Sequence, residues 1–180
     1  GGLIGLHSRQ AGYVERARAE LADPTIMRNY LTRKRRDKRH DGTVRKAIRE
    51  KQPLSRTQIA KITGRYADRL LQRRGRDIAR TEAHNAFNAG RYEAIEQMIE
   101  SGQVPADAVK LIWQATPDTR VRDPHRSMNG QEVRYGVPFQ SPTGALLRFP
   151  GDTELGASGD DTINCRCGFR VDIDFVALAA

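Results

Sequence analysis

Apolar residues in the middle of the chain recur at helical spacings. Ile59, Ile62, Tyr66 and Leu70 lie three or four positions apart. Residues at these spacings share one face of an α-helix, and that face can pack against a core. We therefore predict helices over residues 55–101. A second apolar stripe in this region comprises Ile78, Phe87, Tyr92, Ile95 and Ile99.

Local signals divide the helical part of the chain. Pro53 marks a boundary, because proline disfavours the helical conformation in the residue before it. Ser55-Arg-Thr-Gln58 has the form of a capping box, in which two side chains bond to the first free backbone amides of a helix. Before the boundary we predict a short helix over residues 13–21. A second helix begins at Thr25, enters a basic run and is broken or bent at Gly42.

Beyond residue 102 the pattern changes to short strands separated by loops. Phe169, Val171, Ile173 and Phe175 alternate with charged residues, which is typical of a strand with one buried face. Six of the eight prolines lie in this part, where loops between strands need them. The predicted strands occupy residues 110–116, 132–135, 145–149 and 166–175.

These patterns together predict an α+β fold. A basic helical arm over residues 1–52 precedes an α+β domain over residues 53–180. In that domain the helices lie within residues 55–101, and a small, loop-rich antiparallel β-containing region occupies residues 104–180.

Positive charge is concentrated near the N-terminus. The chain has a net charge of +9, and residues 28–49 alone hold ten Lys and Arg against two Asp. Such a run predicts an anionic partner, either nucleic acid or an acidic protein surface, although it would also suit a solvated helix face. Its densest part, Arg33-Lys-Arg-Arg-Asp-Lys-Arg39, contains no aromatic residue, so contacts with DNA there would be to phosphates. The candidate binding residues are Arg33, Lys34, Arg35, Arg36, Lys38 and Arg39.

The two cysteines and one histidine suggest a small metal site. Cys165 and Cys167 are the only cysteines, and the strand alternation places both on the buried face. As thiolates they could bind Zn²⁺ with His125, the fourth ligand being Asp118, Asp123 or Asp152. The alternative is a pair of small, inert core side chains packed against Trp113. Apart from this possible structural zinc, no cofactor is expected.

His125 also allows an enzymatic interpretation. With Asp118 and the nearby arginines it could act as an acid–base group on a phosphodiester, as in a nuclease or toxin-like domain. The sequence shows no second base or nucleophile, and a histidine that fixes a turn is the simpler reading. Asp118 and Arg122 could pair across that turn. His84 is predicted to lie in a polar seam where its helix meets the sheet. No apolar run is long enough to cross a membrane.

Several motifs in this order resemble the phage Mu protein F-like family. They are Arg80-Thr-Glu82, Asn88-Ala-Gly90, Trp113 with Ala115-Thr116-Pro-Asp118, Arg120-Val-Arg122, His125, Asn129-Gly130, Phe149-Pro-Gly-Asp152 and Ile163-Asn-Cys-Arg-Cys167. The resemblance covers roughly residues 76–175. The family's motif positions fall on Asp118, Arg120, Arg122, His125, Asn164, Cys165, Arg166 and Cys167.

The resemblance implies a structural role rather than an enzymatic one. Such proteins are minor head, or head morphogenesis, proteins of tailed phages and prophages. It implies a location in the virion after assembly in the host cytoplasm. It also implies a place in a larger assembly, with the portal protein or capsid protein as partner and packaged DNA as a further possibility. A free-standing DNA-binding module is the remaining alternative, and the aromatic-poor basic run disfavours it.

Overall fold

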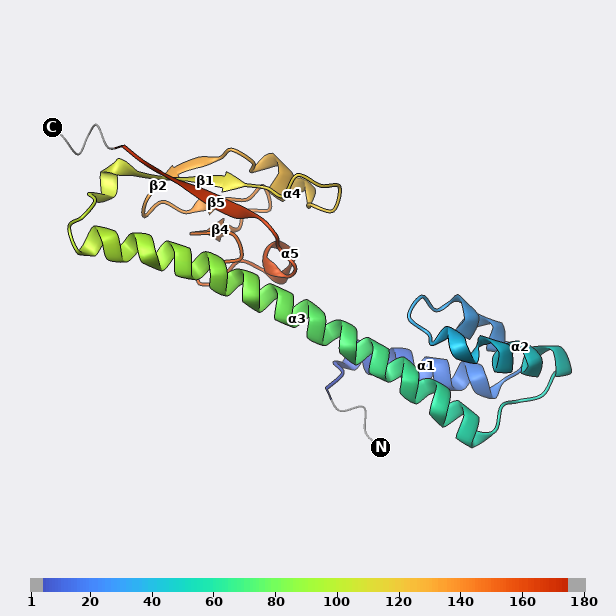
Figure 1. The fold of residues 1–180 in the computed structure, drawn as a ribbon. Coiled ribbons are helices and arrows are strands. Elements are labelled where there is room, and N and C mark those ends of the chain that lie inside the picture. Colours follow the sequence, from blue (N-terminus) through green and yellow to red (C-terminus); the bar gives the residue numbers. More distant parts are fainter. Residues whose placement is uncertain (1–4, 175–180) are drawn as a thin grey trace. The chain divides into compact units, whose positions relative to one another are not determined.

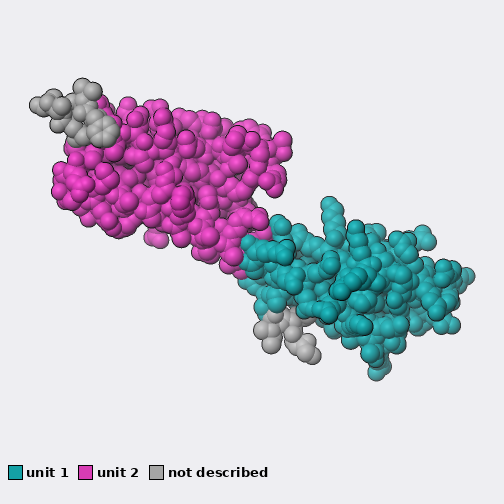
Figure 2. Space-filling model, in the orientation of Figure 1, with its two compact units in different colours: residues 1–76 teal, residues 77–180 magenta. Residues whose placement is uncertain are grey.

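The computed structural model describes residues 5–174, which form two compact units. Residues 1–76 belong to the first unit and residues 77–180 to the second (Figure 2). Helix α3, Arg56–Glu100, contributes its first part to one unit and its remainder to the other (Figure 1). The α+β class is confirmed. The predicted division into an arm of residues 1–52 and a domain of residues 53–180 stays a prediction.

The first unit is helical throughout. It contains α1 (Ser8–Ala22), the 3₁₀ helices η1 (Met27–Thr32) and η2 (Lys38–His40), α2 (Asp41–Glu50) and the start of α3. The buried residues come from all of these elements except η2, so residues before and after Pro53 share one core. That core comprises Val14, Ala17, Leu21, Met27, Tyr30, Val44, Ala47, Leu54, Ile59, Ile62, Tyr66 and Leu70.

The predicted helix from Thr25 into the basic run is wrong. Only the short η1 forms there, and Arg33 then takes an extended conformation. Ion pairs hold the turn that follows: Arg33 donates two hydrogen bonds of 2.8 Å to Glu20, and Arg36 binds Asp41 in the same bidentate way. Gly42 does not break a helix but lies in the first turn of α2.

Helix α3 begins as the sequence predicts. The Ser55 amide donates to Gln58 Oε1 at 2.9 Å and the Gln58 amide donates to Ser55 Oγ at 3.2 Å, which confirms the capping box. The first apolar stripe is buried as predicted. The second is wrong at Ile78 and Phe87, which are 48% and 62% exposed. In their place Thr81 and Asn88 are buried on the same helix.

The second unit packs a small antiparallel sheet against the rest of α3 (Figure 1). After η3 (Ala106–Ala108), the strands are β1 (Val109–Gln114), β2 (Glu132–Arg134) and β5 (Gly168–Ile173), in the order β2-β1-β5. A separate hairpin pairs β3 (Phe139–Gln140) with β4 (Leu146–Leu147). Two short helices, α4 (Asp123–Ser127) and α5 (Gly159–Thr162), lie in the connections.

The four predicted strands are present, with shorter bounds than expected. Strand β3 was not predicted. Position 175, the end of the last predicted strand, lies outside the described residues. In the β1–β5 pair, Trp113 faces Phe169 and Leu111 faces Val171. The buried centre of this unit includes Leu111, Trp113, Phe139, Leu147 and Phe169.

Tyrosines join the sheet to the helix. Tyr92 of α3 stacks on Tyr135 with ring centroids 5.5 Å apart, and the Tyr135 hydroxyl donates to Glu96 at 3.0 Å. The helix is thus fixed to the sheet edge by both apolar and polar contacts. Within residues 5–174, none of the helices combines the length and apolar character that a membrane crossing requires.

Candidate metal centre

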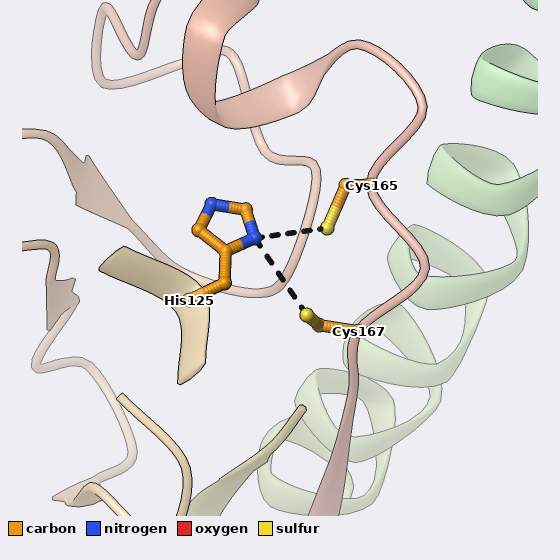
Figure 3. A group of neighbouring side chains, drawn as sticks. All are labelled: His125, Cys165 and Cys167. Atoms are coloured by element: carbon orange, nitrogen blue, oxygen red, sulfur yellow. Dashed lines mark hydrogen bonds between the residues drawn. The ribbon is translucent and has the colours of Figure 1, made fainter. Parts of the chain in front are cut away.

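His125, Cys165 and Cys167 meet in the interior of the second unit, as the sequence predicts. The histidine Nδ1 lies 3.6 Å from each of the two sulfurs (Figure 3). All three residues are at most 2% exposed, and both cysteines are free thiols. Their potential ligand atoms lie within 4.8 Å of one another. Residues 40 positions apart in the chain therefore converge on one point.

The two cysteines do not lie in the last strand. They occupy an extended segment between α5 and β5, and Asn164 before them has a left-handed backbone with φ of 55°. The predicted alternation of burial nonetheless continues through this segment: Cys165, Cys167 and Phe169 are buried, while Arg166 between the cysteines is half-buried. The inward orientation of the sulfurs was thus predicted correctly for a segment that is not a strand.

A polar face of α3 holds the cysteine segment. The ring of His84 lies 2.7 Å from the Cys167 carbonyl oxygen through Nε2, and Asn88 Nδ2 donates to the same oxygen at 3.1 Å. Asn88 also donates to the Pro150 carbonyl at 2.8 Å, and the Asn164 amide donates to Thr81 Oγ1 at 2.9 Å. The predicted polar seam is confirmed, and its partners are backbone groups of the loops.

His125 is oriented from its other side by a carboxylate. Its Nε2 lies 3.4 Å from Asp161 Oδ1, close enough for electrostatic attraction but not aligned as a hydrogen bond. Asp161 is itself buried and accepts from Ser141 at 3.1 Å and from Thr143 at 2.9 Å. The Trp113 ring packs edge-on against the imidazole. Sequence reasoning missed Asp161, because no spacing relates it to a histidine 36 positions earlier.

The two thiols have opposite acidities. The hydrogen bond from Cys165, followed by that from His125, lowers the pKa of Cys167. The same contact with Cys167, together with burial, raises the pKa of Cys165. The pair therefore favours one thiolate and one thiol that share a proton. Buried thiols with this arrangement are not exposed nucleophiles.

The remaining motif residues brace the loops around this cluster. Asp118 accepts from Arg166 Nη2 at 2.7 Å and from the Arg120 amide at 2.9 Å. The Arg166 hydrogen bond, aided by the Arg120 amide, holds the pKa of Asp118 well below its usual range. Arg122 donates to the Ile163 carbonyl, so the expected pairing of Arg122 with Asp118 is wrong.

None of the three predicted fourth ligands joins the cluster within the described residues. Asp118 is engaged by Arg166, Asp123 is paired with Arg126, and Asp152 is bound by Arg148. The predicted pairing of His125 with Asp118 as an acid–base couple is likewise not formed. A small cavity of about 130 Å³ instead borders the cluster. Its other lining residues are Thr116, Arg120, Val121, Arg122, Asn164 and Arg166.

The six basic candidate residues of the first unit separate into two groups. Arg33, Arg36 and Arg39 are engaged in ion pairs with Glu20, Asp41 and Asp37. Lys34, Arg35 and Lys38 are exposed. Lys34 and Arg35 line one surface pocket together with residues of α3, which the sequence interpretation did not include. The basic pocket, as we call it, is lined by Lys34, Arg35, Arg69, Gln72, Arg73 and Arg76.

Comparison with known proteins places the chain in a family. The family described as "Phage Mu protein F like protein" matches residues 38–170. Over 101 residues the chain is 32% identical to "Minor head protein GP7" of Bacillus phage SPP1, a match covering 56% of this chain and 30% of that protein. The chain thus spans less than a third of this relative's length. No solved structure shows significant similarity to the chain. Because the family match covers well over half of its residues, the chain belongs to the phage Mu protein F-like family.

Proposed function

We propose that this chain is a structural component of a tailed-phage head. It acts as a minor head protein during morphogenesis and is retained in the virion, in contact with the portal or capsid protein. Family membership carries the proposal, and the named role of the SPP1 relative supports it. Because the match involves 30% of that relative, the region described here supplies one part of such a protein's function.

The basic pocket supports an anionic partner in the head. Five of its six lining residues are Lys or Arg, and the lining contains neither an acidic nor an aromatic side chain. Cations spaced along a groove fit the phosphates of a nucleic acid backbone, whereas base stacking would require aromatic rings. Packaged DNA is therefore the partner that this surface fits best, and sequence specificity is not expected.

The role we propose is non-enzymatic. The histidine on which a nuclease would depend is buried against two sulfurs, and its expected carboxylate partner binds Arg166. The motif residues instead form contacts between the loops and the helix. Such contacts stabilise a scaffold and do not require catalysis.

Particle assembly tests the head role directly. The protein is to be co-expressed with the portal and major capsid proteins of its own phage, and the particles are to be separated by sedimentation. We expect the protein to sediment with portal-containing heads and to be visible there by electron microscopy. Recovery only in the soluble fraction, from particles that otherwise assemble normally, would refute the proposal.

The salt dependence of DNA binding tests the pocket. Each phosphate contact contributes about 0.9 to the slope of log K against log salt on duplex DNA. A Lys34→Ser, Arg35→Ser double variant should therefore make this negative slope less steep by about two. Arg45→Ser with Arg49→Ser is the matched control, because these exposed arginines of α2 do not line the pocket. A salt-independent interaction would exclude phosphate contacts and point to a protein partner instead. An equal loss in the control would show that binding is not localised to the pocket.

A further inference from the structure

We propose that His125, Cys165 and Cys167 bind one divalent ion of the zinc class, and that solvent from the adjoining cavity supplies the fourth ligand. The inference is independent of the head role, because it depends only on the geometry inside the second unit. Two soft sulfur ligands and one imidazole form a donor set that favours zinc, whereas harder cations such as Mg²⁺ or Ca²⁺ favour oxygen ligands.

The two nitrogen–sulfur distances match those around a tetrahedral ion. Zinc lies about 2.3 Å from thiolate sulfur and about 2.0–2.1 Å from imidazole nitrogen, so at a tetrahedral angle nitrogen and sulfur are about 3.6 Å apart. Both observed Nδ1–Sγ distances are 3.6 Å. A single Nδ1 carries at most one hydrogen, so hydrogen bonding alone satisfies only one of these two contacts. One ion between the three atoms satisfies both.

The surroundings supply an outer contact that metal ligands commonly have. With Nδ1 directed at the ion, Nε2 of His125 would carry the proton on the side where Asp161 Oδ1 lies 3.4 Å away, and a carboxylate in this position commonly orients a histidine ligand.

The fourth position faces the small cavity. The acidic side chains that might have closed the site are bound to arginines elsewhere, and Asp161 is on the opposite side of the ring. The cavity has room for water, and Arg120, Arg122 and Arg166 line it. These cations favour a water or small anion as the last ligand. The ion would join α4 to the segment before β5, where it stabilises a unit whose main sheet has three strands.

Metal analysis of the purified chain is the first test. The protein should be prepared without chelator and without a metal-affinity tag, then assayed for zinc by mass spectrometry and for free thiols. We expect about one equivalent of zinc and thiols that react only after the metal is removed. Less than about a tenth of an equivalent, even after incubation of the folded protein with zinc, would overturn the proposal. A disulfide between the two cysteines would overturn it as well.

Cobalt substitution tests the ligands even where a variant folds poorly. In the wild-type protein Co²⁺ should give a sulfur-to-cobalt charge-transfer band and intense tetrahedral visible bands. Cys165→Ser and Cys167→Ser should each weaken the charge-transfer band, and His125→Gln should alter the visible bands. His40→Gln in the first unit is the matched control and should change neither. Wild-type cobalt protein with only weak octahedral bands would refute the site.

Two further measurements address the outer shell and the open position. Asp161→Asn should weaken zinc binding about 10- to 100-fold while the cobalt spectrum keeps its tetrahedral form. Unchanged affinity would remove Asp161 from the site. Added azide should shift the visible bands of the cobalt protein if solvent holds the fourth position. A spectrum that does not respond to azide would show instead that a protein side chain closes the site.

Discussion

At the scale of single residues, Gly151 shows how close the loops lie to α3. Its φ is +94°, and a Cβ added there would collide with the side chain of Asn85. Gly151→Ala combines backbone strain with this collision, so it should lower the free energy of unfolding by about 1–3 kcal/mol or more. Gly156 also has a positive φ but open space around it, and Gly156→Ala should therefore cost less. Urea unfolding of both variants would show the difference. Equal costs would mean that the approach to Asn85 is unimportant.

Asp118 gives a residue-scale prediction for pH. Because its pKa is depressed in the folded chain, its ionised form stabilises the fold above the unfolded aspartate pKa of about 3.9. That contribution is lost as the pH falls through the lower, folded pKa. Asp118→Asn should therefore be less stable than the wild type at neutral pH, with the difference shrinking below about pH 4. Unfolding curves across this range, with the exposed Asp123→Asn as control, measure it. A pH-independent difference would show that charge is not involved.

At the scale of elements, the start of α3 rests on the capping box. Replacing Ser55 with alanine leaves the Gln58 amide without its side-chain acceptor and should cost about 1 kcal/mol. Thr57→Ala, one position inside the box and exposed, is the control and should be nearly neutral. Denaturant titration followed by circular dichroism compares the two. A similar loss in both variants would indicate that helix propensity, not capping, sets the stability of this end.

The same helix shows what could be predicted from sequence and what could not. Its first apolar stripe was correct, because Ile59 to Leu70 pack on other apolar side chains, the kind of burial that periodicity detects. The second stripe was wrong at Ile78 and Phe87, because the helix there turns polar residues inward. Asn88 is buried and His84 half-buried against carbonyls of Cys167 and Pro150, far along the sequence. Periodicity detects apolar burial but not a polar face whose partners are distant loops.

The candidate centre was predictable to a similar extent. Cys165, Cys167 and His125 were identifiable by residue type, and alternation gave the inward direction of the sulfurs. The pairing of Asp118 with Arg166 and the position of Asp161 depend on how α5 and the loops after β1 come together. Contacts of this kind leave no spacing in the sequence, since each joins segments that are tens of residues apart.

At the scale of the whole molecule, positive charge is concentrated in the first unit, whereas the candidate metal ligands lie in the second. Residues 1–76 hold 21 Lys and Arg against 7 Asp and Glu, whereas residues 77–180 hold 10 against 15. We therefore expect polyanions to favour the first unit over the second, which has a net negative charge. The cysteine and histidine cluster lies entirely in the second unit, which has its own hydrophobic core. Two ligands of different chemistry are thus expected to act on different units of one chain.

Hydrogen exchange on the intact chain can separate these effects. A ligand that binds only folded protein stabilises the region it contacts and slows the exchange of amides there. DNA should slow exchange around Lys34, Arg35 and the first part of α3, and leave residues 109–173 unchanged.

Removal of zinc by a chelator should affect the other unit. Exchange should become faster in α4, β1 and β5, while the core around Val14 and Tyr30 keeps its protection. Magnesium, added after chelation, should not restore the lost protection, whereas zinc should. Uniform changes across both units would show that the two cores unfold as one, and the separation of function between them would then have to be abandoned.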